Sequence, residues 1–349
     1  MLQRLTPAAG CWRLSWLQVL GAWLVGAAVL IAACQPSLGE AAAGRGASPA
    51  GAPAARAPLP TTLPQATGTP AATGRPPVAR PAGEPRPAEA LPEWVGPLWG
   101  RFLEEHFYSA ALDREMPYYL YLPPSASVQE QRVPVLYMLH GAAGDNAEWA
   151  TIKLIDWTDR LIVDGEIPPM IVVLPQGDFG YWVNHVDDGP RWGDYLVVDL
   201  VTHLDTAYPT QPNLRARAVG GLSQGGHGAL QLTFNHPDVF GVAGAHSPSL
   251  RPDDGFLPFL GTGAEYARRD PISLAETLPL ATLLRPRLWL DVGADDPWRP
   301  RVELLHQILL ERGVPHEWHE GVGGHDGDYW QPNVPTYLRW YGQALRAGL

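Results

Sequence analysis

The segment around Ser223 has the residue types and spacing of a nucleophilic serine. It runs Gly221-Leu222-Ser223-Gln224-Gly225, so a glycine stands two residues before the hydroxyl and another two residues after it. This spacing suits a tight turn between a strand and a helix, because larger side chains at the flanking positions would collide. A serine on such a turn projects from the amino end of the helix, where N–H groups and the helix dipole favour developing negative charge. The spacing therefore predicts a nucleophile elbow with Ser223 as the catalytic nucleophile.

A serine hydroxyl is a weak nucleophile and needs a base that is oriented by an acid. After a nucleophile elbow, the acid and the histidine follow the serine in chain order. Asp295 and Asp296 come directly after the apolar run 287–292, where the acid should lie, and the residues alone leave both open. His325 stands in a glycine-flanked segment near the end of the chain and is the expected base. Asp291, inside the apolar run, is interpreted as a structural residue.

Short apolar runs predict the strands that position these side chains. Runs that are apolar almost throughout indicate strands buried on both faces, and hence a mostly parallel sheet. The runs are 133–139, 170–174, 217–220, 240–245 and 287–292.

Helical patterns lie between and after these runs. The predicted helices are 195–207, 224–235, 302–312 and 335–347. Alternating strands and helices predict an α/β fold with its site at the carboxyl ends of the strands.

A segment rich in proline and glycine, 247–278, is expected to form a small cap over the site. Its residues Phe256, Phe259 and Tyr266 would suit an apolar acyl pocket, although packing of the cap onto the sheet is the commoner use of such side chains.

In combination, these pieces resemble the putative-esterase family of α/β-hydrolases, which includes esterase D, feruloyl and acetyl-xylan esterases, enterochelin esterases and mycolyltransferases. The matching pieces follow the family's order across residues 100–345. They are 140–145 (His-Gly-Ala-Ala-Gly-Asp), the serine turn, 236–241, 293–296 and 324–325. The resemblance implies an α/β-hydrolase fold, with a mostly parallel central sheet and helices on both faces.

The same resemblance implies a serine carboxylic-ester hydrolase that works through an acyl-enzyme intermediate. The catalytic residues would be Ser223, His325 and Asp296, since the family's acid lies three residues after the glycine of its loop. An oxyanion hole needs two backbone N–H donors. Gln224, directly after the nucleophile, should supply one, and Ala142 in the family's His-Gly loop the other. No cofactor and no metal are implied.

The beginning of the chain predicts export. Arg4 and Arg13 precede a run of fifteen apolar and small residues, 19–33, which is shorter than the ~20 residues of a membrane span. Small residues directly before Cys34 resemble a bacterial lipobox. We expect a signal peptide over residues 1–33, lipidation of Cys34, and a secreted, membrane-anchored lipoprotein of the cell envelope. The alternative is an uncleaved signal anchor over 16–33.

The next segment, residues 34–92, predicts an unstructured linker. Residues 35–92 contain thirteen Pro, no aromatic residue and no Asp. Such a composition buries too little apolar area to offset the entropy of ordering. Residues 93–349 then form the expected catalytic domain.

Charge and cysteine content exclude several classes of function. The chain carries −11, and since residues 1–92 carry +4, residues 93–349 carry −15. Nucleic-acid binding requires clustered Lys and Arg and is excluded on this ground. Cys11 and Cys34 both precede the domain, so it holds no disulfide and no cysteine zinc site. The expected partners are an ester of a small molecule or polysaccharide, and the membrane through Cys34.

Three other functions remain open from the sequence. The nearest is acyl transfer to a sugar or lipid acceptor instead of water. A peptidase would use the same residues, but no extra domain that would select peptides is evident. A surface binding protein with this fold and without catalysis is the alternative from another class.

Overall fold

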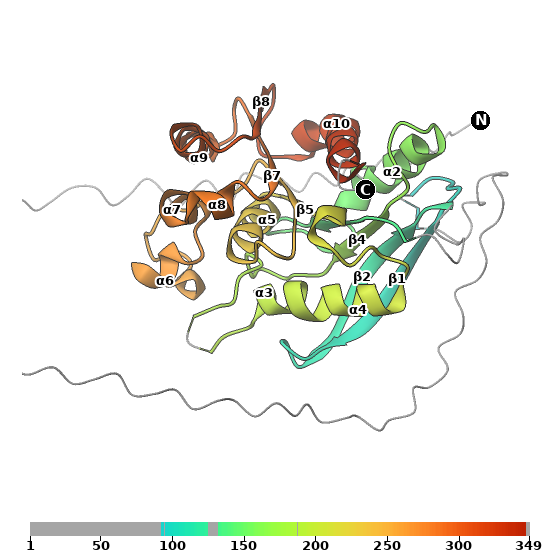
Figure 1. Cartoon of the computed structure of the whole chain (residues 1–349), viewed down its shortest axis with the longest axis horizontal. Coiled ribbons are helices and arrows are strands. Elements are labelled where there is room, and N and C mark those ends of the chain that lie inside the picture. Colours follow the sequence, from blue (N-terminus) through green and yellow to red (C-terminus); the bar gives the residue numbers. More distant parts are fainter. Residues whose placement is uncertain (1–91, 94, 125–131, 187, 347–349) are drawn as a thin grey trace, which may run out of the picture. The chain divides into compact units, whose positions relative to one another are not determined.

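The computed structural model describes residues 92–93, 95–124, 132–186 and 188–346. The predicted signal peptide, Cys34 and almost all of the predicted linker lie outside these residues. An eight-stranded sheet of order β1-β2-β4-β3-β5-β6-β7-β8 forms the centre of the domain (Figure 1). The strands are β1 (Arg101–Ser109), β2 (Arg114–Leu122), β3 (Val135–Leu139), β4 (Ile171–Pro175), β5 (Arg217–Leu222), β6 (Val242–His246), β7 (Arg287–Gly293) and β8 (Glu317–Gly321).

Helices connect and cover these strands. They are α1 (Glu148–Thr151), α2 (Leu154–Val163), α3 (Trp192–Asp194), η4 (Tyr195–Leu200), α4 (Val201–Ala207), η5 (Leu214–Ala216), α5 (Gln224–Asn235), η6 (Pro258–Leu260), α6 (Ala264–Ala267), α7 (Pro271–Thr277), α8 (Leu280–Leu283), α9 (Arg299–Glu311) and α10 (Gly327–Arg346). Within the described part of the chain, no helix combines the length and apolarity that crossing a bilayer requires.

The sheet is mostly parallel, as predicted. β1 pairs antiparallel with β2, and β2 with β4, whereas all other neighbours are parallel. All five predicted strands are present. β1, β2 and β8 have no counterpart among the predicted strands. β1 and β8 are edge strands, and all three have exposed or partly exposed positions. Their polar residues interrupt the apolar runs by which the inner strands are recognised.

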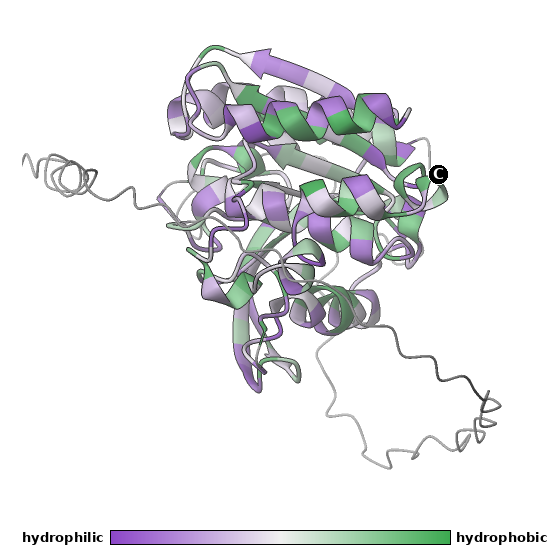
Figure 2. Ribbon diagram, turned by 90° about the vertical axis from the view of Figure 1, so that its left-hand side faces the viewer, coloured by the Kyte–Doolittle hydropathy of each residue, from purple (hydrophilic) through white to green (hydrophobic). Residues whose placement is uncertain are grey.

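Alternate residues of the inner strands face two separate apolar cores. In β3, Val135, Tyr137 and Leu139 belong to one core, while Leu136 and Met138 belong to the other. Residues of η4, α4, α5, α7 and α9 complete the first core, and residues of α2 and α10 the second. Figure 2 shows both apolar and polar segments on the helices that cover the sheet, as expected where one side packs and the other faces water. The predicted α/β fold with helices on both faces is confirmed.

The four predicted helices are present, although α9 and α10 begin and end at other residues than predicted. α5 begins and ends as predicted. The helix predicted over 195–207 is a π-helix, η4, that continues into α4. The terminal helix, predicted over 335–347, is α10, which begins eight residues earlier at Gly327 and contains Pro332 and Pro335.

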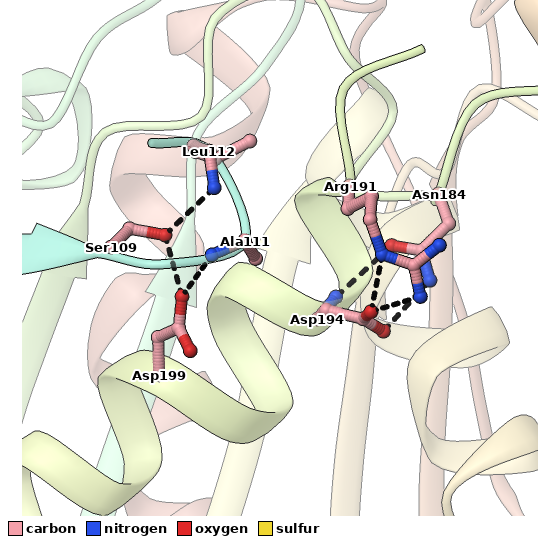
Figure 3. Close-up of polar contacts among 7 residues, drawn as sticks. All are labelled: Ser109, Ala111, Leu112, Asn184, Arg191, Asp194 and Asp199. Atoms are coloured by element: carbon pink, nitrogen blue, oxygen red, sulfur yellow. Dashed lines mark hydrogen bonds and ion pairs between the residues drawn. The ribbon is translucent and has the colours of Figure 1, made fainter. Parts of the chain in front are cut away.

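Asp199 of η4 fixes the turn of the β1–β2 hairpin. Its carboxylate accepts hydrogen bonds from Ser109 Oγ at 2.6 Å and from the Ala111 N–H at 2.8 Å. Ser109 Oγ in turn accepts the Leu112 N–H at 3.2 Å (Figure 3). The hairpin, far from η4 in sequence, is therefore attached to the helical layer.

Asp194 closes the loop that precedes η4. Its carboxylate accepts from Asn184 Nδ2 at 2.8 Å and from Arg191 Nε at 2.7 Å, and its own N–H donates to Asn184 Oδ1 at 3.1 Å (Figure 3). This loop begins at the carboxyl end of β4 and borders the candidate active site.

Candidate active site

Ser223 occupies a strained turn between β5 and α5, as the motif predicted. Its backbone has φ 55° and ψ −120°, a conformation that side-chain-bearing residues rarely adopt. A Cβ on Gly221 would lie 2.3 Å from the carbonyl carbon of Gly225. A Cβ on Gly225 would lie 2.2 Å from the Leu139 oxygen. Both glycines are thus required by close backbone approaches, and the turn holds the serine at the carboxyl end of the sheet.

The structure brings the three predicted catalytic side chains into one hydrogen-bonded line. His325 Nε2 lies 2.8 Å from Ser223 Oγ, and His325 Nδ1 lies 2.8 Å from Asp296 Oδ2. Ser223 follows β5, Asp296 lies on the loop after β7, and His325 lies on the loop after β8. The side chain of Asp296 is fully buried, and its Oδ1 accepts the Trp298 N–H at 2.7 Å. Asp295, which the residues alone left open, is exposed and does not contact His325.

The two predicted oxyanion donors lie beside this line. Ala142 follows Gly141, where an added Cβ would lie 3.4 Å from Ser223 Cβ, so the His-Gly loop lies against the nucleophile. Gln224 is the first residue of α5. Within the described residues, neither the Ala142 N–H nor the Gln224 N–H has an acceptor. Both donors are therefore available to an oxygen of a bound substrate.

Three side chains hold the His-Gly loop in place. Gln224 Nε2 donates to the Gly141 carbonyl at 3.2 Å, and His140 Nδ1 donates to the same oxygen at 2.8 Å. His140 Nε2 accepts the Gly177 N–H at 2.9 Å, so the ring is neutral, and burial lowers the pKa of His140 below its ordinary value. His140 is thus a residue that shapes the loop and not a catalytic base.

Glu148 is the third of these side chains, and sequence reasoning missed it. Its Oε2 accepts the Gly141 N–H at 2.6 Å, and a Cβ on Gly144 would lie 2.5 Å from its carboxyl carbon. Burial raises the pKa of Glu148, whereas the Gly141 N–H and the nearby His325 act in the opposite direction. An acid before a tryptophan in a short irregular helix carries no sequence signal of this role.

Asp291 is structural, as interpreted, and forms the centre of a buried network behind the site. Its Oδ2 accepts from His246 Nδ1 and Trp289 Nε1, both at 2.6 Å. Its Oδ1 accepts from Tyr329 OH at 2.9 Å and Tyr337 OH at 3.0 Å. The network joins β6 and β7 to α10, which starts two residues after His325.

We expect replacement of Asp291 by alanine to destabilise the fold strongly. The change leaves four buried donors without their acceptor, and loss of a buried charged partner costs about 3 to 5 kcal/mol. The free energy of unfolding from urea denaturation measures this, with Asp295→Ala on the exposed neighbouring loop as control. A loss no larger than that of the control would contradict the assigned role.

His227, directly behind the nucleophile, links stability to pH. It is fully buried, and its Nε2 donates to the Arg269 carbonyl at 2.8 Å. Burial lowers the pKa of His227 to about 4, although Asp270 acts in the opposite direction. An unfolded chain, with a histidine pKa of about 6.5, binds this proton more readily than the folded protein does.

The free energy of unfolding should therefore fall as the pH is lowered from about 7 towards 4. The contribution of His227 is on the order of 3 kcal/mol, fully present above about pH 6.5 and lost as the pH approaches its folded pKa. Urea denaturation at both pH values, compared with His227→Gln, measures it. An equal acid-induced loss in the variant would show that His227 is not responsible.

The predicted cap packs against the loop after β4. Leu257, Leu260 and Tyr266 form a small apolar cluster with Tyr181 and Val183, and Phe259 packs against it. Tyr266 and Phe259 therefore attach the cap to the domain, which is the second of their two expected uses. Phe256 is 58% exposed and remains outside the cluster.

Comparisons with known proteins identify the family of this chain. The family model described as "Putative esterase" matches residues 109–341. The chain is 27% identical over 237 residues to an esterase of Mycobacterium tuberculosis, covering 58% of this chain and 51% of that protein. It is 24% identical over 265 residues to an acetyl esterase of Caldicellulosiruptor saccharolyticus, covering 68% of this chain and 97% of that protein. The chain thus spans about half the length of the mycobacterial relative.

Solved structures show the same fold. A ferulic acid esterase superposes with a TM-score of 0.64 at 24% identity, covering 70% of this chain and 99% of that one. An S-formylglutathione hydrolase from Agrobacterium tumefaciens superposes with a TM-score of 0.60 at 19% identity, covering 70% and 96%. The domain has the α/β-hydrolase fold, and the chain belongs to the putative esterase family.

Proposed function

We propose that this protein is a serine carboxylesterase whose catalytic residues are Ser223, His325 and Asp296. The observation that carries the proposal is the hydrogen-bonded line from the buried Asp296 through both nitrogens of His325 to Ser223 Oγ. An acid, a base and a nucleophile at these distances are what acyl transfer through serine requires. The membership of the family supports the same activity.

In the first half of the reaction, Ser223 Oγ attacks the ester carbonyl and His325 Nε2 takes the hydroxyl proton. The carbonyl oxygen becomes an oxyanion that accepts the N–H groups of Ala142 and Gln224. Asp296 holds Nδ1 protonated, so Nε2 is free to act as the base, and it stabilises the imidazolium cation. The ester C–O bond then breaks, and the alcohol leaves with the proton from His325.

In the second half, water replaces the alcohol. His325 takes a proton from water as the water attacks the acyl-enzyme carbonyl, and then returns it to Ser223 Oγ as the carboxylic acid is released. Every step uses side chains and backbone groups of this chain. Transfer of the same acyl group to a sugar or lipid hydroxyl is the second candidate, favoured by the family's inclusion of such enzymes.

The test is hydrolysis of 4-nitrophenyl esters, from acetate to decanoate, and of a feruloyl ester by the full-length protein. The proposal predicts turnover whose chain-length profile reports the size of the acyl pocket. A parallel assay with added alcohol acceptors separates hydrolysis from transfer by the products formed. Failure of folded protein to turn over any ester, with or without an acceptor, would favour a binding protein instead.

We also propose that the protein is exported and anchored to the cell envelope through lipid on Cys34. The small residues before Cys34 support this, and residues 35–92 would then separate the domain from the membrane. Labelling of cells with radioactive palmitate tests the proposal. Label in the wild type that is absent from Cys34→Ala is the expected result, while an unlabelled, uncleaved chain would indicate a signal anchor.

A further inference from the structure

Arg251 lies beside the candidate active site, attached to the segment that contacts the nucleophile. It stands two residues after Ser249, whose N–H donates to the Ser223 carbonyl at 3.0 Å. Arg251 Nε donates to Tyr181 OH at 3.1 Å, and Ser249 Oγ donates to the same oxygen at 3.0 Å. Tyr181 itself is fully buried, and its N–H lies 3.4 Å from Gln224 Oε1. Arg251 is thereby tied to the turn that carries the nucleophile.

On its other side, Arg251 contacts the loop of the proposed acid. Its guanidinium carbon lies 4.9 Å from the ring centroid of Trp298, the residue whose N–H donates to Asp296. The ring of Phe256 lies 4.5 Å from the same guanidinium carbon. The two rings and the Tyr181 hydroxyl hold the cation between the nucleophile's segment and the acid's loop.

The guanidinium of Arg251 has no carboxylate partner in the described part of the chain. None of the ion pairs among the described residues includes it. The acids nearest in sequence are engaged with backbone groups, since Asp253 accepts the Gly263 N–H and Asp254 the Phe256 N–H. Its two Nη groups have no hydrogen-bond partner in the described part of the chain and are not buried.

A fixed guanidinium with free Nη groups is suited to an oxyanion ligand. Its planar fork matches the two oxygens of a carboxylate, and a pair of this kind gives both charge and orientation. The two aromatic rings beside the guanidinium restrict its movement. One cation matches the single charge of a carboxylate, and a domain of net charge −15 disfavours more highly charged anions.

We propose that Arg251 binds a carboxylate carried by the ester substrate and thereby determines specificity. This proposal rests on the proposed esterase function and adds the substrate class, an ester with a second, free carboxyl group. Arg251 would act in substrate binding and would take no part in the proton transfers of Ser223 and His325.

Matched ester pairs test the proposal with the full-length protein. In the acyl series, the 4-nitrophenyl half-esters of adipic and suberic acid are compared with 4-nitrophenyl hexanoate and octanoate. In the alcohol series, 4-acetoxybenzoate is compared with its methyl ester. The quantity measured is the ratio of kcat/KM for the anionic substrate to kcat/KM for its neutral partner. Turnover of the neutral partner reports that a variant is folded and that its catalytic residues are intact.

For Arg251→Gln, the ratio should fall about 10- to 100-fold in at least one series, because a hydrogen-bonded charge pair is lost. Arg251→Lys retains the charge but loses the planar guanidinium that can bind both carboxylate oxygens. Its ratio should therefore fall less than that of Arg251→Gln. Arg285→Gln is the matched control, since Arg285 pairs with Asp238 before β7, at the opposite end of the strand from Asp296. It should keep the wild-type ratio.

The outcomes separate the two proposals. An active enzyme whose ratio is the same in the wild type and Arg251→Gln in both series would overturn the role of Arg251 and leave the esterase proposal standing. A fall of the ratio in Arg285→Gln equal to that in Arg251→Gln would also overturn it, because net charge alone would then explain the effect. A wild-type protein that hydrolyses none of the esters would overturn the esterase proposal itself.

Discussion

Replacement of Ser223 by alanine is expected to lower kcat by at least about 10⁴-fold, because the attacking oxygen is lost while the oxyanion donors and the fold remain. The best 4-nitrophenyl ester found for the wild type provides the assay. Circular dichroism and urea denaturation establish that the variant is folded.

Ser247→Ala is the matched control for this variant. Ser247 is also buried and lies one residue after β6, but its hydroxyl has no hydrogen-bond partner within the described residues. It should retain wild-type turnover. If Ser223→Ala kept more than about one hundredth of the wild-type kcat, direct attack by Ser223 would be excluded, since loss of a nucleophile costs far more than this.

Replacement of Asp296 by asparagine should lower kcat by about 10⁴-fold. The amide keeps the size of the side chain, but it cannot hold His325 with the proton on Nδ1 or stabilise the imidazolium cation. Asp295→Asn makes the same chemical change one residue earlier, on an exposed side chain. Comparison of kcat for the two variants isolates the contact with His325.

The kcat values of Asp296→Asn and Asp295→Asn together show which carboxylate orients His325. A large loss in Asp296→Asn with near-normal turnover in Asp295→Asn agrees with the 2.8 Å contact. Equal losses would indicate that charge in this loop matters rather than orientation of the imidazole. A loss confined to Asp295→Asn would mean that the loop rearranges when substrate binds.

The nucleophile turn could be predicted from the sequence because its geometry is local. A Cβ at Gly221 or Gly225 would lie 2.2 to 2.3 Å from backbone atoms, so the turn itself requires the two glycines of the sequence pattern. The inner strands were predictable for a similar reason, since burial on both faces requires an apolar residue at nearly every position.

The residues around Asp295 and Asp296 in the sequence do not determine which of the two is the catalytic acid. Adjacent side chains point in different directions, and the direction of each depends on the turn after β7. In that turn the Asp296 N–H donates to the Gly293 carbonyl, and the Asp295 N–H donates to the Gly323 carbonyl of the histidine's own loop. Only the resemblance to the family favoured Asp296.

The supporting residues were even less accessible to sequence reasoning. Glu148 and Arg251 owe their positions to partners that lie 7 and 70 residues away, Gly141 and Tyr181. No periodicity or spacing connects such pairs. A carboxylate next to Gly141 and a cation next to Tyr181 become visible only when the loops after β3, β4 and β6 are assembled at the carboxyl end of the sheet.

The central claim is that Ser223 is the nucleophile that carries the acyl group. Labelling with a fluorophosphonate, which reacts covalently with activated serines, followed by mass spectrometry of the proteolytic peptides, tests this most directly. We predict one stoichiometric adduct on the peptide that contains Ser223, and none in Ser223→Ala. An adduct on a different serine, or no adduct on folded protein that hydrolyses esters, would contradict the account.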